Sequence, residues 1–134
     1  MIVVDTNIIC YRCMASPYAK AADAVWQRDP QWIAPTLWRS EFRNALAGAL
    51  RQRSLTLESA LEIADLAEGL MKGNEFVIPA PAVLRLVATS NCSAYDCEFV
   101  ALAQEHRIPL VTVDRKVLRC FPKTAIALET FAQS

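Results

Sequence analysis

The chain has few of the residues on which several classes of enzyme depend. Its 134 residues include a single histidine, His106, and three glycines. One histidine excludes a ribonuclease in which one imidazole is the general acid and a second is the general base. No serine lies in a G-x-S-x-G motif and no G-x-x-x-x-G-K loop is present, which excludes serine hydrolases of that type and P-loop nucleotide hydrolases. We expect His106 to serve the end of a helix or the surface.

Long apolar runs and an excess of one charge are also missing. No apolar run reaches the ~20 residues of a membrane-spanning helix, and the first residues carry no basic segment typical of a signal peptide. We therefore expect a cytoplasmic protein with no membrane partner. The 14 basic residues balance 14 acidic ones, whereas a protein that coats nucleic acid is basic. Any attraction for nucleic acid must therefore be local.

The cysteines do not form a recognisable framework. There are five, an odd number, and most lie in apolar segments, so we expect reduced thiols that pack as small apolar groups. Cys10 and Cys13 have the C-x-x-C spacing of zinc and redox sites. A zinc site with four protein ligands needs a second pair at similar spacing, and the chain has none.

The pattern of apolar residues predicts an α/β fold. The length fits one domain over residues 1–134, and short β-branched runs alternate with helical patterns, as in folds with a parallel sheet. Strands are expected at residues 2–4, 32–34, 76–78, 110–113 and 126–128. Helices are expected at residues 7–27 with a break near Ser16-Pro17, at 36–50, at 56–73, from 81 onward, and at 93–107.

Two of the predicted strands are followed by an aspartate. Asp5 and Asp114 each lie just past the carboxyl end of a strand, and this is the edge of an open α/β sheet where ligands bind. Taken alone, either residue can also be a turn former or a helix cap. If the two strands are neighbours, Asp5 and Asp114 converge.

Two further acids lie in predicted helices. Asp96 comes three residues after the cap Ser93, in a first turn where the helix dipole favours an anion; alternatively, it only completes a capping box. Glu41 borders the buried face of its helix, where a carboxylate without a partner is unfavourable. Its alternative is a surface pair with Arg39 or Arg43.

The conjunction of these acids predicts a metal site. Converging carboxylates raise one another's pKa, and a hard divalent cation relieves that repulsion. Mg²⁺ and Mn²⁺ prefer oxygen ligands and keep several waters, so a few carboxylates suffice without histidine or cysteine. Such a site can polarise a phosphodiester and activate water.

Four segments in order resemble the motifs of PIN domains. They are residues 2–7 (IVVDTN), 40–46 (SEFRNAL), 93–96 (SAYD) and 110–114 (LVTVD). Because their order and spacing cover nearly the whole chain, the resemblance is specific. It implies a three-layer α/β/α fold around a short central parallel sheet of four to five strands.

The compact form of the chain resembles the VapC-type toxins of bacterial toxin–antitoxin pairs. This implies a Mg²⁺- or Mn²⁺-dependent endoribonuclease that is a homodimer and is inhibited by a small antitoxin protein. By position, the catalytic and metal-binding acids would be Asp5, Glu41, Asp96 and Asp114, with Asp5 and Asp96 the more direct ligands. The supporting polar residues would be Thr6, Asn7, Ser93 and Thr112.

Basic residues near these acids are candidates for contacts with RNA phosphates. Each of them can equally be a solvated surface charge. They are Arg39, Arg43, Arg115, Lys116 and Arg119.

Three alternatives remain beside the nuclease. A haloacid-dehalogenase-type phosphohydrolase has a second aspartate two positions after the first, where this chain has Asn7. A receiver domain has its acceptor aspartate after a mid-chain strand, but the strand expected at 76–78 is followed by Pro79. A non-catalytic PIN-like module that binds RNA or protein is the third alternative.

The helix expected over residues 57–71 has an unusually wide apolar arc. Ile63, Leu66 and Leu70 extend it beyond what one core contact needs. An exposed apolar patch usually marks an interface, so we expect a homodimer in which an antitoxin segment also covers apolar surface. The alternative is a helix buried on two sides.

Overall fold

The computed structural model describes residues 1–134 and has a five-stranded, all-parallel sheet at its centre. The strand order is β3-β2-β1-β4-β5. The strands are β1 (Ile2–Val4), β2 (Trp32–Pro35), β3 (Glu75–Phe76), β4 (Leu110–Thr112) and β5 (Ala125–Ala127). The predicted α/β class with a parallel sheet is therefore confirmed.

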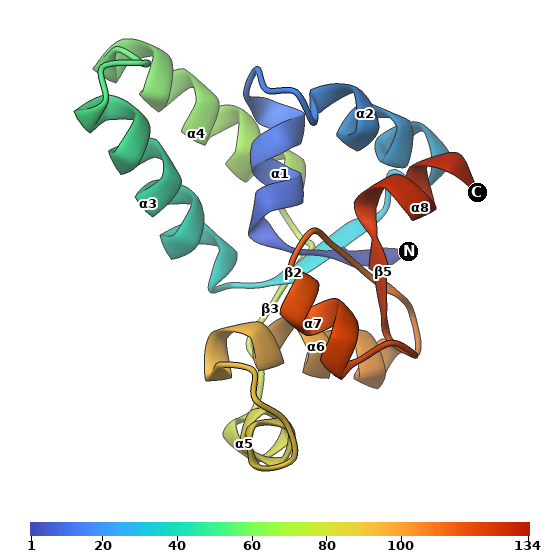
Figure 1. Ribbon diagram of the computed structural model, residues 1–134. Helices are drawn as coiled ribbons and strands as arrows, with labels where there is room; N and C mark the ends of the chain where they lie inside the picture. Colours follow the sequence, from blue (N-terminus) through green and yellow to red (C-terminus); the bar gives the residue numbers. More distant parts are fainter.

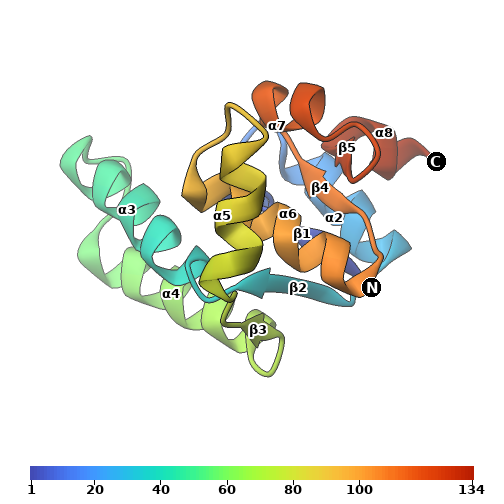
Figure 2. The ribbon, with the colours of Figure 1, turned by 90° about the horizontal axis from the view of Figure 1, so that it is seen from below.

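Helices cover both faces of this sheet. They are α1 (Thr6–Cys13), α2 (Ala19–Arg28), α3 (Trp38–Arg51), α4 (Leu57–Met71), α5 (Ala80–Ala88), α6 (Ala94–His106), α7 (Arg115–Cys120) and α8 (Leu128–Gln133). Helices α1, α2, α4 and α8 lie on one side, and α5 and α6 lie on the other (Figures 1 and 2). This is the expected three-layer arrangement.

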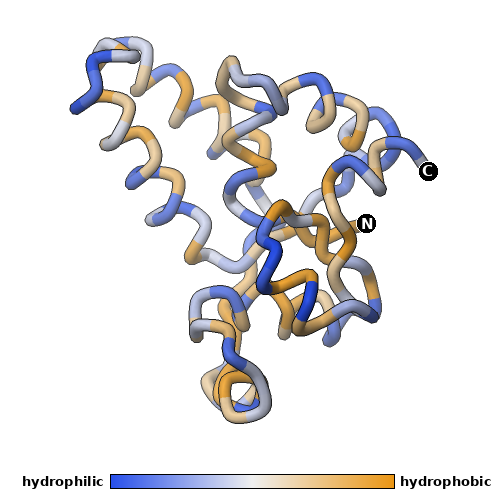
Figure 3. Tube along the Cα trace, in the orientation of Figure 1, coloured by the Kyte–Doolittle hydropathy of each residue, from blue (hydrophilic) through white to orange (hydrophobic).

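The core follows from the two covered faces. Strands β1 and β4 are in the middle of the sheet, and every residue in them is buried, which suits their uninterrupted apolar sequences. Figure 3 shows the most hydrophobic segments in this central part and hydrophilic segments along the outer helices. Helix α6 is buried over much of its circumference because it contacts β1, β2 and β4.

Some boundaries differ from the sequence-based expectation. Strand β3 was expected at 76–78, but only Glu75 and Phe76 pair with β2, and the following Val77 is 83% exposed. Helix α3 begins at Trp38, two residues after the expected cap Thr36. Helices α7 and α8 were not predicted, because six residues are too few for a clear apolar period.

Two expectations about composition can be compared with the structure. All five cysteines are free, and three of them, Cys10, Cys92 and Cys97, are buried. No helix combines the length and the apolar character that crossing a membrane requires.

The single histidine lies where the sequence predicted it, at the end of a helix. His106 ends α6, where its Nδ1 lies 3.1 Å from the carbonyl oxygen of Leu102.

Candidate active site

The pairing of β1 with β4 brings the two strand-end aspartates to the same edge of the sheet. In this register Val4 is opposite Val111, and the backbone N–H of Asp5 donates to the carbonyl oxygen of Val111 at 3.2 Å. The carboxyl ends of parallel strands share one edge, so the acids that follow them are neighbours. The condition set by the sequence, adjacency of the first and fourth strands, is met.

Thr112 connects these two aspartates. Its side chain is buried, with 1% exposure, and its hydroxyl donates to Oδ2 of Asp5. The same hydroxyl oxygen accepts a hydrogen bond from the backbone N–H of Asp114 at 3.0 Å. Oδ1 of Asp5 accepts from the N–H of Ile8 at 3.2 Å. Both oxygens of Asp5 are therefore held, and its carboxylate has a fixed orientation.

Asp5 and Asp114 are also helix caps, as the simpler alternative predicted. Asp5 caps α1 through Ile8. Asp114 caps α7, because its Oδ1 accepts from the N–H groups of Lys116 and Val117 at 2.9 and 3.0 Å. Capping uses only one oxygen of Asp114, and its other oxygen has no hydrogen-bond partner. Capping and a role in binding are thus compatible for Asp114.

Glu41 reaches the same region from α3. The hydroxyl of Thr6, at the start of α1, donates to its Oε1 at 2.7 Å. Glu41 makes no ion pair with Arg39 or Arg43, which removes the alternative of a surface pair. The partner of this half-buried carboxylate is a buried hydroxyl rather than a cation.

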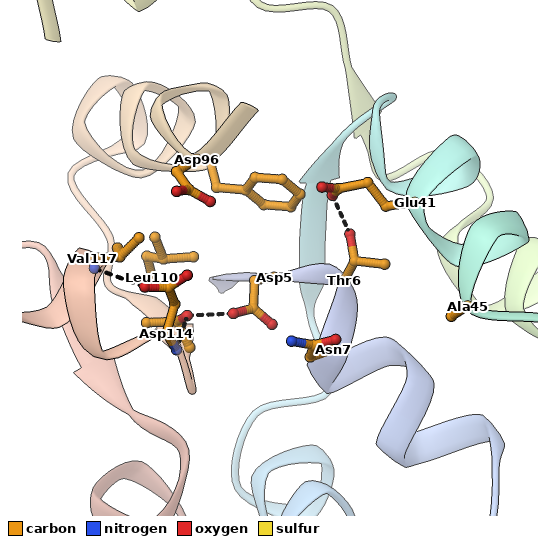
Figure 4. A pocket seen from close by; sticks show the side chains of 11 residues that line it. Asp5, Thr6, Asn7, Glu41, Ala45, Asp96, Leu110, Asp114 and Val117 are labelled. Atoms are coloured by element: carbon orange, nitrogen blue, oxygen red, sulfur yellow. Dashed lines mark hydrogen bonds between the residues drawn. The ribbon is translucent and has the colours of Figure 1, made fainter. Parts of the chain in front are cut away.

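Asp96 enters from the opposite side, in the first turn of α6. Ser93 caps that helix, and its Oγ accepts from the backbone N–H of Asp96 at 3.1 Å. Because the cap uses the backbone of Asp96, it leaves the carboxylate available. Figure 4 shows Asp96 and Glu41 across the pocket from each other, with Asp5 and Asp114 beneath them.

The four acids line one cavity of about 230 Å³. Its wall comes from α1, α3, α6, β4 and α7 and from the two junctions that hold Asp5 and Asp114, so the sequence motifs come together only in the fold. No lysine, arginine, histidine or cysteine is among the lining residues. The full lining is Asp5, Thr6, Asn7, Glu41, Ala45, Asp96, Phe99, Leu110, Thr112, Asp114 and Val117. Ser93 does not line the cavity and acts only through the start of α6.

The electrostatics of this cavity are unfavourable to its own carboxylates. Burial raises the pKa of Asp5 to about 6, and the nearby charge of Asp114 adds to this, although hydrogen bonds from Thr112 and Ile8 oppose it. Burial also raises the pKa of Asp96, again with a contribution from Asp114, while Ser93 and Lys116 oppose the shift. Without a cation, the pocket holds more negative charge than its surroundings neutralise.

The donor set fits a hard divalent cation. The side-chain atoms of the lining that can bind a metal are carboxylate, hydroxyl and amide oxygens, the type that Mg²⁺ and Mn²⁺ prefer. As placed, no three carboxylate, imidazole or thiolate side chains converge at ligand distance. Mg²⁺ typically keeps several waters and takes only one or two carboxylates directly. The pocket therefore suits a hydrated ion rather than one enclosed by protein ligands.

The predicted basic residues fall into two groups. Arg39 points away from the cavity to Glu75, with Nε–Oε1 and Nη2–Oε2 distances of 2.6 and 2.9 Å, and to Glu68 at 2.7 Å. Arg43 lies 3.5 Å from Glu68. Neither arginine lines the acidic cavity, because acids of α4 and β3 bind them more closely.

The cations of α7 are nearer to the pocket. Lys116 is close enough to Asp96 to lower its pKa. Arg115 and Arg119 are exposed on the same short helix. Phe99 and Val117, which form apolar wall next to the acids, were not predicted from the sequence. Their spacing of three residues after Asp96 and Asp114 was a signal that could have found them, since such residues share a helix face.

Comparisons with known proteins agree with this architecture. A family model described as "PIN domain" matches residues 2–125. No curated protein sequence matches the chain. The crystal structure of PAE2754 from Pyrobaculum aerophilum is similar, with a TM-score of 0.76 and 24% identity over 98% of this chain and 93% of that chain.

Two other solved structures are similar over nearly their full lengths. The crystal structure of FitAcB from Neisseria gonorrhoeae has a TM-score of 0.74 and 16% identity, over 96% of this chain and 98% of that one. A toxin–antitoxin complex from Klebsiella pneumoniae has a TM-score of 0.70 and 18% identity, over 96% and 98%. At these identities the likeness establishes the shared fold.

Proposed function

The chain belongs to the PIN domain family, and from this membership we propose that residues 1–134 form one metal-dependent endoribonuclease domain. The family consists of nucleases. The observation that carries the proposal is the acidic cavity at the carboxyl edge of the sheet, where Asp5, Glu41, Asp96 and Asp114 meet without a neutralising cation. A site of this kind acts on a substrate that is itself an anion only when a cation is present.

In this proposal Asp5 and Asp96 bind Mg²⁺ or Mn²⁺ most directly, and Glu41 and Asp114 complete the acidic cluster. When bound, such a cation polarises a phosphodiester and makes water a better nucleophile.

Hydrogen bonds within the protein orient these carboxylates. Thr112 and the N–H of Ile8 hold Asp5, and Thr6 holds Glu41 through one oxygen. The second oxygen of Glu41 has no partner, so it can accept a proton from the attacking water.

We place the RNA over the face that carries α7. Lys116, Arg115 and Arg119 lie just beyond Asp114 and supply positive charge beside a negative pocket. Phosphate contacts of this kind position a nucleic acid without reading its sequence. They also explain how a chain with no net charge can attract RNA.

We further propose that the protein is the toxin of a type II toxin–antitoxin pair, acting in the cytoplasm as a homodimer. One support is its similarity in fold to a protein in a toxin–antitoxin complex. The other is α4, where Leu57, Leu61 and Leu66 are 63%, 62% and 57% exposed, while Ile63 and Leu70 are half-buried. Apolar side chains exposed to this extent on one helix suit an interface with a second copy or a small antitoxin.

Cleavage of single-stranded RNA by the purified protein tests the proposal. We expect cutting with Mg²⁺ or Mn²⁺ and none with EDTA. Asp5→Asn and Asp96→Asn should be folded and inactive, whereas Asp65→Asn, which removes an exposed acid of α4, should cut like the wild type. Cleavage at full rate in EDTA would contradict the mechanism. RNA binding without any cleavage would instead indicate a non-catalytic module.

A further inference from the structure

A second cavity adjoins the acidic one at the same edge of the sheet. Its volume is about 280 Å³. Thr112 belongs to both linings, so the two cavities share a wall at the end of β4. The lining residues come from the α1–α2 loop, from the end of β4 and the β4–α7 junction, from α7, and from the end of β5 and the start of α8; Figure 1 shows where these elements lie. The lining residues are Tyr18, Thr112, Val113, Arg115, Leu118, Ala127, Leu128 and Glu129.

The walls of this cavity combine an aromatic ring with aliphatic side chains. Tyr18 is 45% exposed, and its ring lies against Tyr11 with a centroid distance of 4.8 Å. That contact restricts the orientation of the Tyr18 ring. Val113 and Leu118 are apolar parts of the lining. A flat, partly apolar group can therefore lie in the cavity with the Tyr18 ring as one of its walls.

Two opposite charges face the same cavity without pairing. Arg115 and Glu129 both line it, both are exposed, and neither makes an ion pair or a side-chain hydrogen bond. The guanidinium of Arg115 is suited to a phosphate oxygen. The carboxylate of Glu129 can only accept hydrogen bonds, so it is suited to an amino group. A nucleotide can offer both a phosphate oxygen to Arg115 and an amino group to Glu129, whereas an apolar side chain offers neither.

We propose that this second cavity binds an unpaired nucleobase adjacent to the phosphodiester in the acidic pocket, and that this base carries an exocyclic amino group. Tyr18 stacks on the base, Arg115 contacts the connecting phosphate, and Glu129 accepts from the amino group. Single-stranded RNA is recognised by such stacking and by hydrogen bonds to base edges. The inference rests on the proposed endoribonuclease function and adds a specificity site to it.

The proposal predicts a preference between two bases of equal size. Cytosine has an amino group at the position where uracil has a carbonyl oxygen, and carboxylates accept from the cytosine amino group. A carboxylate facing the carbonyl oxygen of uracil would instead be repelled. The protein should therefore bind a run of cytidines more tightly than a run of uridines, and Glu129 should be the cause.

Fluorescence anisotropy with labelled rC8 and rU8 tests this. Binding is measured with Mg²⁺ in a Glu41→Gln background, which removes the proposed proton acceptor, so that the RNA stays intact, and keeps Asp5 and Asp96 for the cation. Tyr18→Ala should weaken binding of both oligonucleotides by about tenfold, the loss expected for one stacked base. Tyr18→Phe should stay close to the parent. Glu129→Gln should bind rC8 and rU8 equally. Arg115→Ala should weaken both, and Arg51→Ala, at the far end of α3, should weaken neither.

Thermal melts identify any variant that fails to fold. If Tyr18→Ala does not fold, the comparison of rC8 with rU8 in Glu129→Gln and in Tyr18→Phe still tests the base site. Equal binding of rC8 and rU8 by the parent, with no loss in Tyr18→Ala, would overturn the base site. Wild-type cleavage of RNA with Mg²⁺ would leave the proposed function standing in that case. If the wild type neither binds nor cuts RNA, both proposals fail. A changed oligomeric state in Tyr18→Ala with unchanged RNA binding would assign the cavity to a protein partner and overturn the inference.

Discussion

Helix α3 places charges in two regions that differ in how they are neutralised. Glu41, on one face, lies in a cavity with three aspartates and no basic side chain. Arg39, on another face, joins Glu75 and Glu68 in an ion cluster. The pKa of Asp5 is raised in the first region. In the second, hydrogen bonds from Arg39 and Trp38 lower the pKa of Glu75.

This difference separates a structural set of charges from a functional one. In the ion cluster both acids contact Arg39, and Glu68 also lies 3.5 Å from Arg43, so the folded chain needs nothing further there, and the cluster ties α3 to β3 and α4. In the acidic cavity burial, together with the charge of Asp114, disfavours the charged forms of Asp5 and Asp96, and such perturbed groups concentrate at functional sites. We therefore assign binding to the cavity and stability to the cluster, and four measurements can separate them.

The largest predicted effect is the response to metal. Mg²⁺ at about a hundredfold excess over its Kd should raise the free energy of unfolding of the wild type by about 2.7 kcal/mol. Asp96→Asn should show little of this gain, because it replaces a carboxylate that we propose as a direct metal ligand. Glu75→Gln should show all of it. Thermal melts with EDTA and with Mg²⁺ measure the shift, and an equal shift in wild type and Asp96→Asn would leave Asp96 as part of the helix start only.

The second prediction concerns the hydrogen bond that holds Glu41. Thr6→Val keeps the shape of the side chain but removes the hydroxyl that donates to Oε1 of Glu41. Groups that orient ligating side chains typically contribute about ten- to a hundredfold, so we expect the cleavage rate with Mg²⁺ to fall by about tenfold. Thr6→Ser should restore most of the rate. If Thr6→Val also loses the stabilisation by Mg²⁺, Glu41 binds the ion directly.

The acidic cavity could be predicted from the sequence and the ion cluster could not, because the two depend on residues at different separations along the chain. The acids Asp5 and Asp114 each follow a β-branched strand, and Asp96 follows a cap by three residues, so local pattern was enough to select them. The convergence of Asp5 with Asp114 needed only one further condition, the pairing of β1 with β4, which the structure meets.

The ion cluster could not be predicted in that way. Arg39 and Glu75 are 36 residues apart, and they meet because the short edge strand β3 pairs with β2 just before α3 begins. From local spacing, Arg39 was instead a candidate for phosphate contacts. The second cavity could not be predicted for the same reason, since its wall comes from the α1–α2 loop, the ends of β4 and β5, and the two short helices α7 and α8, which have no apolar period of their own.

The third prediction weakens the ion cluster without touching the cavity. Glu75→Gln keeps the size of the side chain but removes the charge that accepts two hydrogen bonds from Arg39 and one from Trp38. Because Arg39 is partly exposed, solvent screens much of the interaction, and we expect the free energy of unfolding to fall by about 1 to 2 kcal/mol. Urea unfolding measures it, with Glu58→Gln as the control for loss of an exposed, unpaired acid of α4. Metal-dependent cleavage by folded Glu75→Gln should remain near that of the wild type.

The smallest predicted effect separates the two regions by pH. In the cation-free protein the pKa of Asp5 is about 6, above its ordinary value of 3.8, so the folded state binds this proton more readily than the unfolded state. The free energy of unfolding should therefore rise as pH falls from 7 through about 6, by about 1 kcal/mol between pH 7 and pH 5. The contribution of Glu75 to the free energy of unfolding changes with pH in the opposite direction. Its pKa is lowered from 4.5, so its stabilisation is complete above pH 4.5 and is lost as pH falls below that value.

Urea unfolding in EDTA between pH 7 and pH 4 can resolve both contributions in three proteins. The wild type should gain stability down to about pH 5 and then lose it. Asp5→Asn should lack the gain, because its amide does not titrate, and should keep the loss at lower pH. Glu75→Gln should keep the gain and lose less stability below pH 4.5. With saturating Mg²⁺ the rise toward pH 5 should disappear from the wild type, since protons then compete with the cation for the same carboxylates. A wild type that loses stability steadily from pH 7 to pH 5 in EDTA would show that burial beside Asp114 does not raise the pKa of Asp5, and the distinction between the two regions would fail.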